Sequence, residues 1–513
     1  MMKKLFKTKK VFVLAGLTAV LVLTSCSDDF LDRTPEDAYN VDDFYQTDAE
    51  VIAASNHLYS RPWFAFVSNV SWGIGELASG NARTWDARNS EFQTYAITGE
   101  HGTLTQAWES LYAVIAQSNS VINTLPEKVG PNVSQEVIDN SIGEARMIRA
   151  TAYFYLVRIF GSVPILEDNT EYVLEPVVPR NPVEDIYEFI ERDLRFSIDN
   201  LHDRTQSSFY QIGRVDSNSA KAMLAKVHLY QENWSMAYQL SNEIINSGAF
   251  SLVEEYNDLF LVQNENNSES VFALQWTDSG VYSEGNALQS FFGSSGISGF
   301  ADGWSALGPS ISLQDAYEDN DERFYGTIMA PGAVYPNLNG GYTVPENINF
   351  QGTNVGIKKY VVGNVGGAMQ SYPNNTYIMR YAEVLLIKAE AAIMGGGPIE
   401  EGLQALNKVR DRAELEDLDS YTLEDVFQER RIELALEGEF WYDVIRRGPD
   451  FSIPFLAAQE KGTFDNSTTP ATVASEKFTP TMDDLLFPYP SNEIQNNPAL
   501  LDPPVPFDFG DEN

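Results

Sequence analysis

The densest group of ionisable side chains lies near the C-terminal end of the chain, between Glu429 and Asp443. Glu429, Glu433 and Glu437 recur every four residues, so on a helix they form one row that needs arginine neighbours to avoid repulsion. Such carboxylates could act as an acid–base site, or they could form a salt-bridged face that attaches this segment to a helical bundle. We favour the salt-bridged face, because apolar residues recur beside the acids at the same four-residue spacing.

Other catalytic and metal-binding patterns do not occur in the sequence. The four histidines, His57, His101, His202 and His228, lie far from one another and from the single cysteine. There is no His-Glu-x-x-His zinc pattern, no Gly-x-Ser-x-Gly elbow and no phosphate-binding loop. Among 73 acidic residues, pairs that resemble a glycosidase dyad arise by chance, so none can be selected. We therefore expect no enzymatic activity, no metal and no cofactor.

Aromatic residues within polar, glycine-rich segments indicate a binding surface instead. A pyranose has an apolar C–H face that an indole or phenol ring can cover, while amide, carboxylate and guanidinium groups bind its hydroxyls. The candidate ligand-binding residues are Trp72, Asn81, Arg83, Trp85 and Asp86 in one segment, and Trp276, Tyr282, Asn286, Phe292 and Trp304 in another. Any of these rings could instead belong to the core. This holds most for Trp276, which follows an apolar run typical of a strand.

The charge of the chain excludes some classes of partner. Its 73 acidic and 34 basic residues give a formal net charge of −39. Nucleic acids and anionic lipid head groups bind to Lys and Arg, so we expect neither as a partner. Aromatic residues make up 12 % of the chain, which supplies many ring faces, although rings are core material first.

The N-terminus has the pattern of a secretory signal. Five lysines in the first ten residues precede an apolar run from Val11 to Leu23 that is too short to span a bilayer. The following Leu-Thr-Ser-Cys resembles a bacterial lipobox, in which the cysteine, here Cys26, becomes the acylated first residue; an ordinary cleavage site beside a coincidental cysteine is the alternative. We expect a signal peptide over 1–25, and a lipid-anchored flexible stem over 26–40.

Apolar periodicity predicts a mainly α fold, with a helical scaffold over about 41–250 and 375–447. The predicted helices are Ala49–Leu58, capped by Asp42 or Thr47; Ala107–Leu125, ended by Pro126; Ile142–Phe160, ended by Gly161; one from Asn181-Pro182 to Leu201; Ser219–Tyr230; Ser235–Asn246; Tyr381–Met394; Ile399–Arg412; and Leu423–Arg447. Two of the helical hairpins carry alanines where their helices would approach closely, which resembles the tetratricopeptide helix pair.

Between residues 252 and 373 the helical periodicity fades, and Gly, Asn, Ser and aromatic residues dominate. Long irregular stretches are usually functional loops or disorder, and the frequent aromatic residues argue against disorder. We expect 252–373 to be a ligand-binding insert and 448–513 to be an irregular, proline-rich segment. Because helical signals flank the insert on both sides, 41–513 is expected to form one unit.

Seven blocks of sequence together resemble the SusD/RagB family of nutrient-binding lipoproteins of Bacteroidetes. The blocks are GEARMIRATAYFYLVRIFGSVPIL from Gly143, GRVDSNSAKAMLAKVHLYQENW from Gly213, LQDAYEDNDERF from Leu313, RYAEVLLIKAEA from Arg380, LNKVRDRA from Leu406, ERRIELALEGEFWYDVIRRG from Glu429 and LLFPYPSNEIQNNPAL from Leu485. Their order covers nearly the whole chain from Cys26 onward, and the Glu-Arg-Arg and Arg-Tyr-Ala-Glu blocks are quite specific.

The resemblance implies four tetratricopeptide-like helix pairs that form a scaffold, with an irregular loop-rich region packed against it. It also implies a partner, a SusC-like TonB-dependent outer-membrane β-barrel, which the lipoprotein caps as a hinged lid. The family's ligand contacts are not a fixed motif, so only regions transfer: the loop from Trp72 to Asp86 and the insert that follows Glu269–Phe272. The acidic run after Cys26 resembles the surface-export signal of these bacteria.

These observations predict a lipid-anchored protein of the outer-membrane surface that binds oligosaccharide or polysaccharide and delivers it to the barrel. Three alternatives stay open at this point. The same architecture could capture peptide or another nutrient, the protein could be a surface glycoside hydrolase, or its helix pairs could bind only other proteins.

Overall fold

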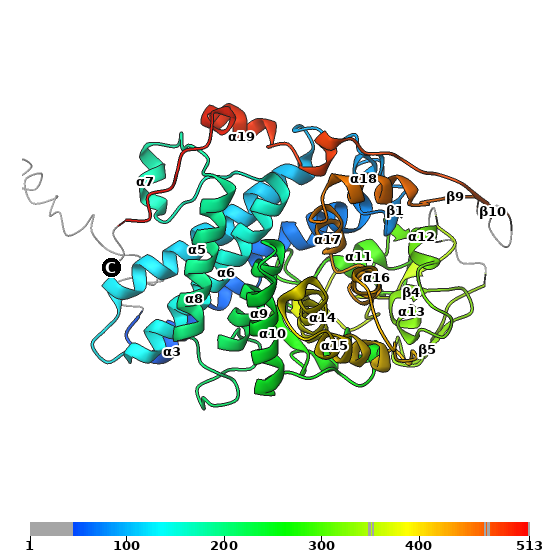
Figure 1. Ribbon diagram of the computed structural model, residues 1–513, viewed down its shortest axis with the longest axis horizontal. Coiled ribbons are helices and arrows are strands. Elements are labelled where there is room, and N and C mark those ends of the chain that lie inside the picture. The colour runs from blue at the N-terminus through cyan, green and yellow to red at the C-terminus, as the bar shows by residue number, and fades with distance from the viewer. Residues whose placement is uncertain (1–44, 347–349, 351–352, 466–467, 469–471, 511–513) are drawn as a thin grey trace, which may run out of the picture.

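A computed structural model describes residues 45–346, 350, 353–465, 468 and 472–510. Helices dominate it, and the loop-rich insert packs beside them (Figure 1). The expected signal peptide, Cys26, the stem and Asp42 lie outside the described residues. Within the described part, no helix combines the length and the apolar character needed to cross a membrane.

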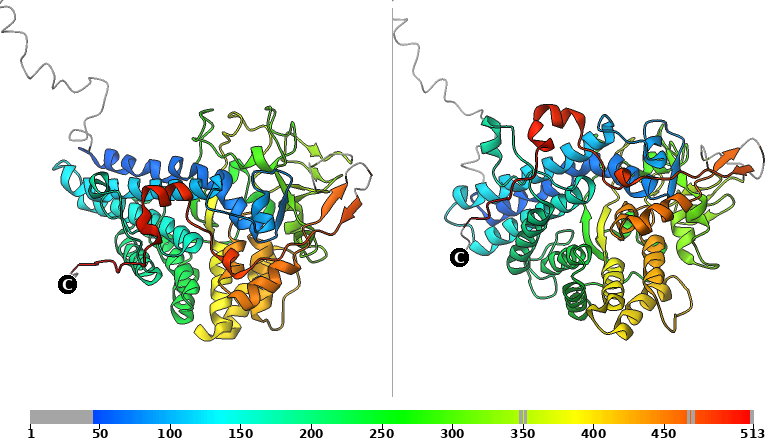
Figure 2. Two further views of the ribbon diagram at one scale, coloured as in Figure 1. Left: turned by 90° about the horizontal axis from the view of Figure 1, so that it is seen from above. Right: turned by 45° about the horizontal axis from the view of Figure 1, so that its top comes forward.

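Eight helices form the scaffold, each in contact with the next in the order of the chain. They are α5 (Gly102–Lys128), α6 (Gln135–Phe160), α8 (Val183–Asn200), α9 (Ser217–Tyr230), α10 (Trp234–Ser247), α14 (Tyr381–Ala391), α15 (Ile399–Arg412) and α16 (Leu423–Glu433). Helices α10 and α14 are neighbours although the whole insert separates them in sequence (Figures 1 and 2). The predicted mainly α class with paired helices is confirmed.

Shorter elements connect and flank this scaffold. The other α-helices of the described residues are α3 (Asp48–Ala54), α4 (Ser90–Thr94), α7 (Asn169–Leu174), α11 (Leu288–Phe292), α12 (Ile311–Gln314), α13 (Glu322–Thr327), α17 (Phe440–Ile445), α18 (Pro449–Ala458) and α19 (Ser491–Asn496). Short 3-10 or π turns occupy Asn56–Tyr59, Arg61–Trp63, Phe66–Val70, Gly73–Ala78, Tyr256–Asp258, Val262–Asn264, Ala392–Gly396, Met482–Leu485 and Pro498–Leu501. Helix α18 is regular structure where we expected an irregular segment.

The local signals for helix ends were correct in some places and wrong in others. Helix α6 ends at Gly161, whose φ of 72° is a conformation that favours glycine. Thr47 caps α3 through a reciprocal capping box with Glu50. Pro126, however, lies inside α5, which continues to Lys128. A proline this close to a C-terminus removes only one hydrogen bond, which the packing of the long helix offsets.

The prediction of a single helix from Leu423 to Arg447 is wrong. Helix α16 ends at Glu433, and the chain then turns through Leu436 and Gly438, whose φ angles are 64° and 87°. Gly75 approaches so closely that a Cβ added to it would lie 2.4 Å from the Gly438 Cα. The Gly438 N–H also donates to the Glu76 carboxylate at 2.7 Å. These contacts come from a distant segment, so helical periodicity within 423–447 could not reveal them.

The strands of the described chain form two-stranded antiparallel pairs. They are β1 (Ala82–Thr84) with β3 (Leu307–Pro309), β2 (Ser270–Leu274) with β8 (Thr376–Arg380), β4 (Ile328–Met329) with β7 (Gly356–Ile357), β5 (Val334–Tyr335) with β6 (Tyr342–Thr343), and β9 (Thr463–Asp465) with β10 (Thr472–Ala474). The β2–β8 pair joins the two ends of the insert, with Ser270 opposite Arg380. The β1–β3 pair attaches the middle of the insert to the N-terminal loop.

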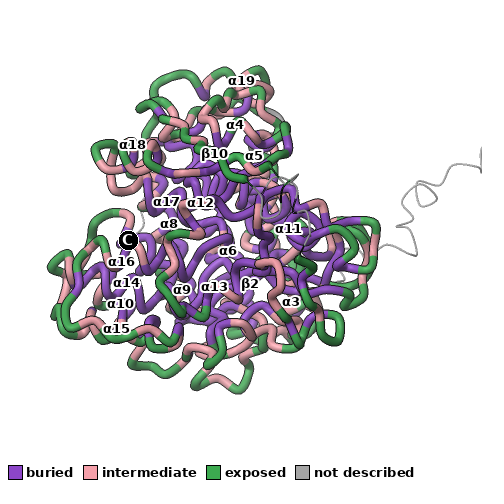
Figure 3. Tube along the Cα trace, turned by 90° about the vertical axis from the view of Figure 1, so that its right-hand side faces the viewer, coloured by how far each residue is buried: buried purple, intermediate pink, exposed green. Residues whose placement is uncertain are grey.

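One hydrophobic cluster includes buried residues of both the scaffold and the insert, and the buried part of the chain trace runs through the centre of the molecule (Figure 3). The C-terminal segment returns from the β9–β10 hairpin along the length of the molecule (Figure 2). On this path the Phe487 N–H donates to the Ile159 carbonyl at 3.1 Å, and the Val505 N–H donates to the Arg180 carbonyl at 2.9 Å.

Candidate functional site

The acidic row that the sequence analysis singled out is buried among arginines. A Glu433 oxygen lies 2.8 Å from Arg380 Nη1, and the other lies 3.1 Å from Arg323 Nη1. Burial alone would raise the pKa of Glu433, but the charges of Arg412, Arg380 and Arg323 outweigh it and hold the pKa well below its usual range. Each acid of the row, Glu429, Glu433 and Glu437, forms an ion pair with a basic side chain of the protein, so the salt-bridged interpretation is confirmed.

The neighbouring acids are paired in the same way. Glu437 lies 2.8 Å from Lys359 Nζ and 2.7 Å from Arg380 Nη2, and Glu429 lies 3.3 Å from Arg410 Nη1. Arg380 also contacts Glu269, so it connects α16 to both ends of the insert. We call the cluster formed by Glu269, Arg323, Lys359, Arg380, Arg410, Arg412, Glu429, Glu433 and Glu437 the ion network. The described residues contain no group of three or more His, Cys, Asp or Glu side chains suited to a metal ion.

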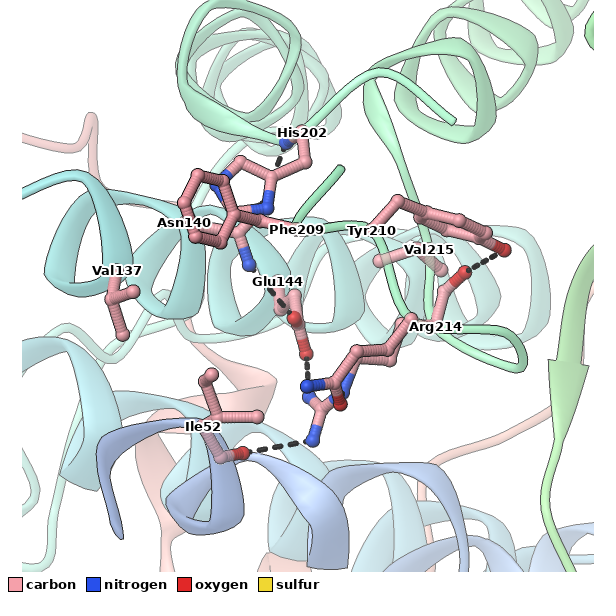
Figure 4. Close-up of a pocket in the computed structure, with 10 residues that line it drawn as sticks. Ile52, Val137, Asn140, Glu144, His202, Phe209, Tyr210, Arg214 and Val215 are labelled. Atoms are coloured by element: carbon pink, nitrogen blue, oxygen red, sulfur yellow. Dashed lines mark hydrogen bonds and ion pairs between the residues drawn. The ribbon is translucent and has the colours of Figure 1, made fainter. Parts of the chain in front are cut away.

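A small pocket between α3, α6 and the loop that precedes α9 is also filled by protein interactions (Figure 4). Arg214 donates to Glu144 at 2.6 Å and to the Ile52 carbonyl at 2.8 Å, and Asn140 donates to Glu144 at 3.0 Å. The cavity measures about 20 Å³, which is space for one or two water molecules. It cannot admit a sugar.

Five of the ten candidate ligand contacts belong to the core. The exposed fractions are 1 % for Trp72, 0 % for Asn81, 6 % for Trp276, 1 % for Asn286 and 1 % for Phe292. The indole N–H of Trp72 donates to the Ser68 carbonyl at 2.6 Å, and that of Trp276 donates to Thr376 Oγ1 at 3.0 Å. A ligand at the surface does not reach these side chains, so for them the core alternative holds.

Two charged candidates have protein partners. Arg83 lies on β1 and is 3.6 Å from Glu476, and Asp86 accepts two hydrogen bonds of 3.0 Å from the Arg88 guanidinium. Their side chains are largely buried. We infer that they hold the loop that follows β1 rather than offering free groups to a ligand.

Three candidates reach the surface, and two of them, Trp85 and Trp304, lie on segments that meet. Trp85 is 49 % exposed and Trp304 is half-buried. The Trp85 indole N–H donates to the carbonyl of Ser305 at 2.8 Å, across 220 residues of sequence. The pairing of β1 with β3 places Thr84 opposite Leu307 and thereby brings the two tryptophan segments together. The two loop regions predicted from sequence therefore meet at one surface.

Buried rings support Trp304 from beneath. Trp304 packs edge-on against Phe291, with ring centroids 5.1 Å apart, and Phe291 packs on Trp72 at 5.7 Å. The loop that carries Trp304 is held by the buried carboxylate of Asp302, which accepts hydrogen bonds from Ser290, Ser298 and Tyr372. Because the supporting groups are buried and hydrogen-bonded, the half-buried Trp304 ring has a defined orientation before any ligand arrives.

A second set of rings supports Tyr282, which is 64 % exposed. Its ring packs edge-on against Phe64 at 4.8 Å, and Phe64 packs on the buried Trp276 at 6.3 Å. The loop at 368–371 connects the two sets, because Ser371 Oγ donates to the Val281 carbonyl at 3.2 Å and the Gln370 N–H donates to Ser290 Oγ at 3.0 Å.

We call the set formed by the exposed side chains of Trp85, Val281, Tyr282 and Met369 and the half-buried Trp304 the aromatic platform. Val281 and Met369 are 49 % and 47 % exposed, and neither was among the residues predicted from sequence to contact a ligand. They are aliphatic residues in glycine-rich loops, which carry no signal for stacking on a ligand. A signal for Val281 was available only as the neighbour of Tyr282.

A polar groove begins close to the platform. Its volume is about 490 Å³, and the side chains that line it include Arg88, Glu91, His101 and Gln106. Arg88 follows Trp85 by three residues, so their Cα atoms are at most about 11 Å apart. His101 Nε2 lies 2.8 Å from the Arg88 carbonyl oxygen, which holds one wall of the groove against α5. The groove presents hydroxyl-binding groups on the loop that carries the exposed Trp85 and on the start of α5.

Comparisons with known proteins agree with this architecture. Residues 224–504 match a family model described as the SusD family, and residues 29–229 match one described as starch-binding and associating with the outer membrane. A SusD-like protein of Bacteroides ovatus is 33 % identical, and the match covers 99 % of this chain and all of that protein.

More distant and structural relatives point the same way. The starch-binding protein SusD of Bacteroides thetaiotaomicron is 22 % identical over 69 % of this chain and 70 % of its own length. A crystal structure with xylogluco-oligosaccharide shares 31 % identity and a TM-score of 0.80, covering 90 % of this chain and 99 % of that one. The family resemblance drawn from seven sequence blocks is confirmed: the chain belongs to the SusD family.

Proposed function

We propose that this protein is a lipoprotein of the outer-membrane surface that binds a neutral oligosaccharide on the aromatic platform and delivers it to a SusC-like TonB-dependent β-barrel. The single observation that carries the proposal is the exposed indole of Trp85, whose N–H donates to the carbonyl of Ser305, the residue that follows the half-buried Trp304. Membership of the SusD family, and the relative whose structure was determined with xylogluco-oligosaccharide, support a glycan as the ligand.

The platform suits the apolar faces of a sugar chain. The indole N–H of Trp85 already donates to a backbone carbonyl, so its ring face is the part left for a ligand. By analogy with aromatic pairs, each stacked sugar would contribute about 0.5–1.5 kcal/mol. Two or three such contacts give micromolar or weaker affinity, which suits a protein that must release its cargo. The hydroxyls of the same chain would be bound by the polar groove.

The charges around the platform favour an uncharged glycan. Glu91 and Glu100 line the groove, while the nearby Arg88 is already paired with Asp86. The whole chain carries a net charge of −39, which disfavours the approach of polyanions. We therefore expect weaker binding of a polyuronate than of a neutral glycan with the same chain length.

The binding proposal is tested by calorimetric titration of the chain that begins after Cys26. Xyloglucan, cello-, malto- and laminari-oligosaccharides are the neutral probes, and oligogalacturonate is the charged one. We expect one neutral class to bind and the double variant W85A/W304A to bind it about thirtyfold or more weakly. The control is Phe209→Ala, which removes an exposed ring outside the platform. Equal binding by the double variant and the wild type would overturn the platform as the site.

Anchoring and delivery need a separate experiment. Incorporation of labelled palmitate should depend on Cys26, so Cys26→Ser should be unlabelled and should leave the outer membrane. The wild-type protein should co-purify with a TonB-dependent barrel from outer-membrane extracts. A labelled C26S variant would contradict the acylation site, and purification without any barrel would contradict the delivery step.

A further inference from the structure

A second pocket lies in the insert, on the side of α13 and β5, and shares no lining residue with the aromatic platform or the polar groove. Its volume is about 80 Å³. The walls are mainly apolar and come from Leu261, Tyr325, Tyr335 and Leu338, and Lys358 supplies a cationic group. Pro336 and Asn337 at its rim are exposed, so the pocket opens to solvent.

The two tyrosines present ring faces rather than hydroxyls. Their rings stack with centroids 4.5 Å apart and an interplanar angle of 27°. The Tyr335 hydroxyl donates to the Ile328 carbonyl at 3.1 Å, and the Tyr325 hydroxyl donates to the Val334 carbonyl. Because backbone carbonyls accept both hydroxyl protons, what the tyrosines offer a ligand is their apolar rings.

Lys358 is a buried cation without an anionic partner among the described residues. Lys358 is 8 % exposed. Its Nζ donates to the Val361 carbonyl at 3.0 Å and lies 5.6 Å from the centre of the Tyr335 ring. The short segments 347–349 and 351–352, which the structure leaves undescribed, contain no Asp or Glu. Buried lysines are almost always paired, because an unpaired buried charge is costly.

The next residue shows what a purely structural lysine looks like in this fold. Lys359 is fully buried, and its Nζ lies 2.8 Å from the Glu437 carboxylate. Burial lowers the pKa of both lysines, and for Lys358 to about 8, so its amine is still mostly protonated at neutral pH. Of these two adjacent buried lysines, only Lys359 has a carboxylate of the described chain beside it.

We propose that the Lys358 pocket binds a carboxylate from outside the chain, with the anion on Nζ and a short apolar body between the tyrosine rings and the leucines. A cavity of about 150 Å³ admits benzene, and this pocket has roughly half that volume, so the inserted body is limited to a few carbon atoms. The carboxylate can belong to a small free acid or to the carboxylated end of a larger molecule. Neither source depends on the glycan proposal.

The test measures thermal stability and calorimetric affinity of the complete lipidated chain in detergent. Propionate is the probe for a free acid, glucuronate is the probe for a carboxylated sugar, and propionamide and glucose are their uncharged controls. We expect at least one carboxylate to raise the melting temperature in a dose-dependent way, with no effect of either control. The responding probe identifies the source.

Lys358→Met should reduce that affinity at least tenfold, since it keeps the length of the side chain and removes only the charge. Lys221→Met removes a partly exposed lysine of α9 and should leave the response unchanged. Leu261→Phe keeps Lys358 and fills the pocket, so it should also abolish binding. This second variant keeps the test decisive if K358M folds poorly. No response to either carboxylate, or an equal response in L261F and the wild type, would overturn the proposal.

Discussion

The ion network and the aromatic platform both join distant segments of the chain, but the network is paired within the protein and the platform is open to solvent. Each brings together side chains from segments far apart in the chain. In the network every carboxylate contacts a cation of the protein, and the side chains of its members are buried. On the platform the Trp85 indole N–H is bound to a backbone carbonyl, while the side chains of Trp85 and Tyr282 remain exposed. A cluster of side chains that could bind a ligand indicates a binding site only where part of their surface is not already in contact with the protein itself.

The tryptophans repeat this contrast within one site. Trp72 and Trp85 lie in the same predicted binding segment, yet the first is 1 % exposed and the second 49 %. The buried ring supports Phe291, which in turn supports Trp304. The core rings thus act on ligand binding only through the orientation of the exposed ones.

The comparison predicts its largest effect for the ion network. Arg380→Met removes a cation shared by Glu269, Glu433 and Glu437 and leaves their charges buried. We expect the free energy of unfolding, measured with urea, to fall by about 3–5 kcal/mol. The control Arg195→Met breaks an exposed pair with Glu191 and should cost less than about 1 kcal/mol. Similar losses in both variants would mean that burial of the network is not what makes it important.

Acid should weaken the scaffold through a second buried cluster. Burial alone would raise the pKa of Glu439, but the charges of Arg158 and Lys226 outweigh it and lower the pKa to about 2. Since the folded-state pKa lies below the unfolded one, this group stabilises the protein above about pH 4.5 and loses its contribution as the pH falls toward 2. That contribution is about 3 kcal/mol.

Urea unfolding at pH 7, 4.5 and 3 measures this effect. The wild type should lose more stability between pH 4.5 and 3 than Glu439→Gln, which has no carboxylate to protonate. Parallel losses in the two proteins would show that other groups govern acid unfolding.

A smaller effect on stability, with a larger one on function, is expected for the platform. Trp85→Ala should change the free energy of unfolding by less than about 1 kcal/mol, because half of the ring is already in water. Glycan affinity should fall about tenfold, which corresponds to about 1.4 kcal/mol. Urea unfolding and calorimetry of the same sample separate the two. A variant that unfolds readily would place Trp85 among the structural rings.

The smallest effect concerns the polar groove. Gln106→Ala removes one hydrogen-bonding group from its lining, which costs about 0.5–1 kcal/mol or a two- to fivefold loss of affinity. The loss should appear with oligosaccharides of six or more units and be absent with disaccharides that occupy only the platform. Gln239→Ala on the exposed face of α10 is the control. Equal losses of affinity for short and long oligosaccharides would show that the groove does not bind the additional sugar units.

Most of the helical scaffold could be predicted because its signals are local. Ile399–Arg412 was predicted with the bounds that α15 has, and Gly161 was recognised as the end of α6. The break between α16 and α17 could not be predicted, because it depends on the contact of Gly438 with the distant Gly75. For the binding candidates, composition selected two segments that meet in the fold, but it could not separate buried rings from exposed ones.

The sequence alone therefore establishes the family, the mainly α class and the positions of most helices, because apolar periodicity and capping act within a few residues. Tertiary structure alone shows which side chains face solvent. The position of Trp85 depends on the strand pairing of its neighbour Thr84 with Leu307 and on the hydrogen bond from its indole N–H to the Ser305 carbonyl, 220 residues away. Burial is a property of segments that meet only in the folded chain, so no local pattern encodes it.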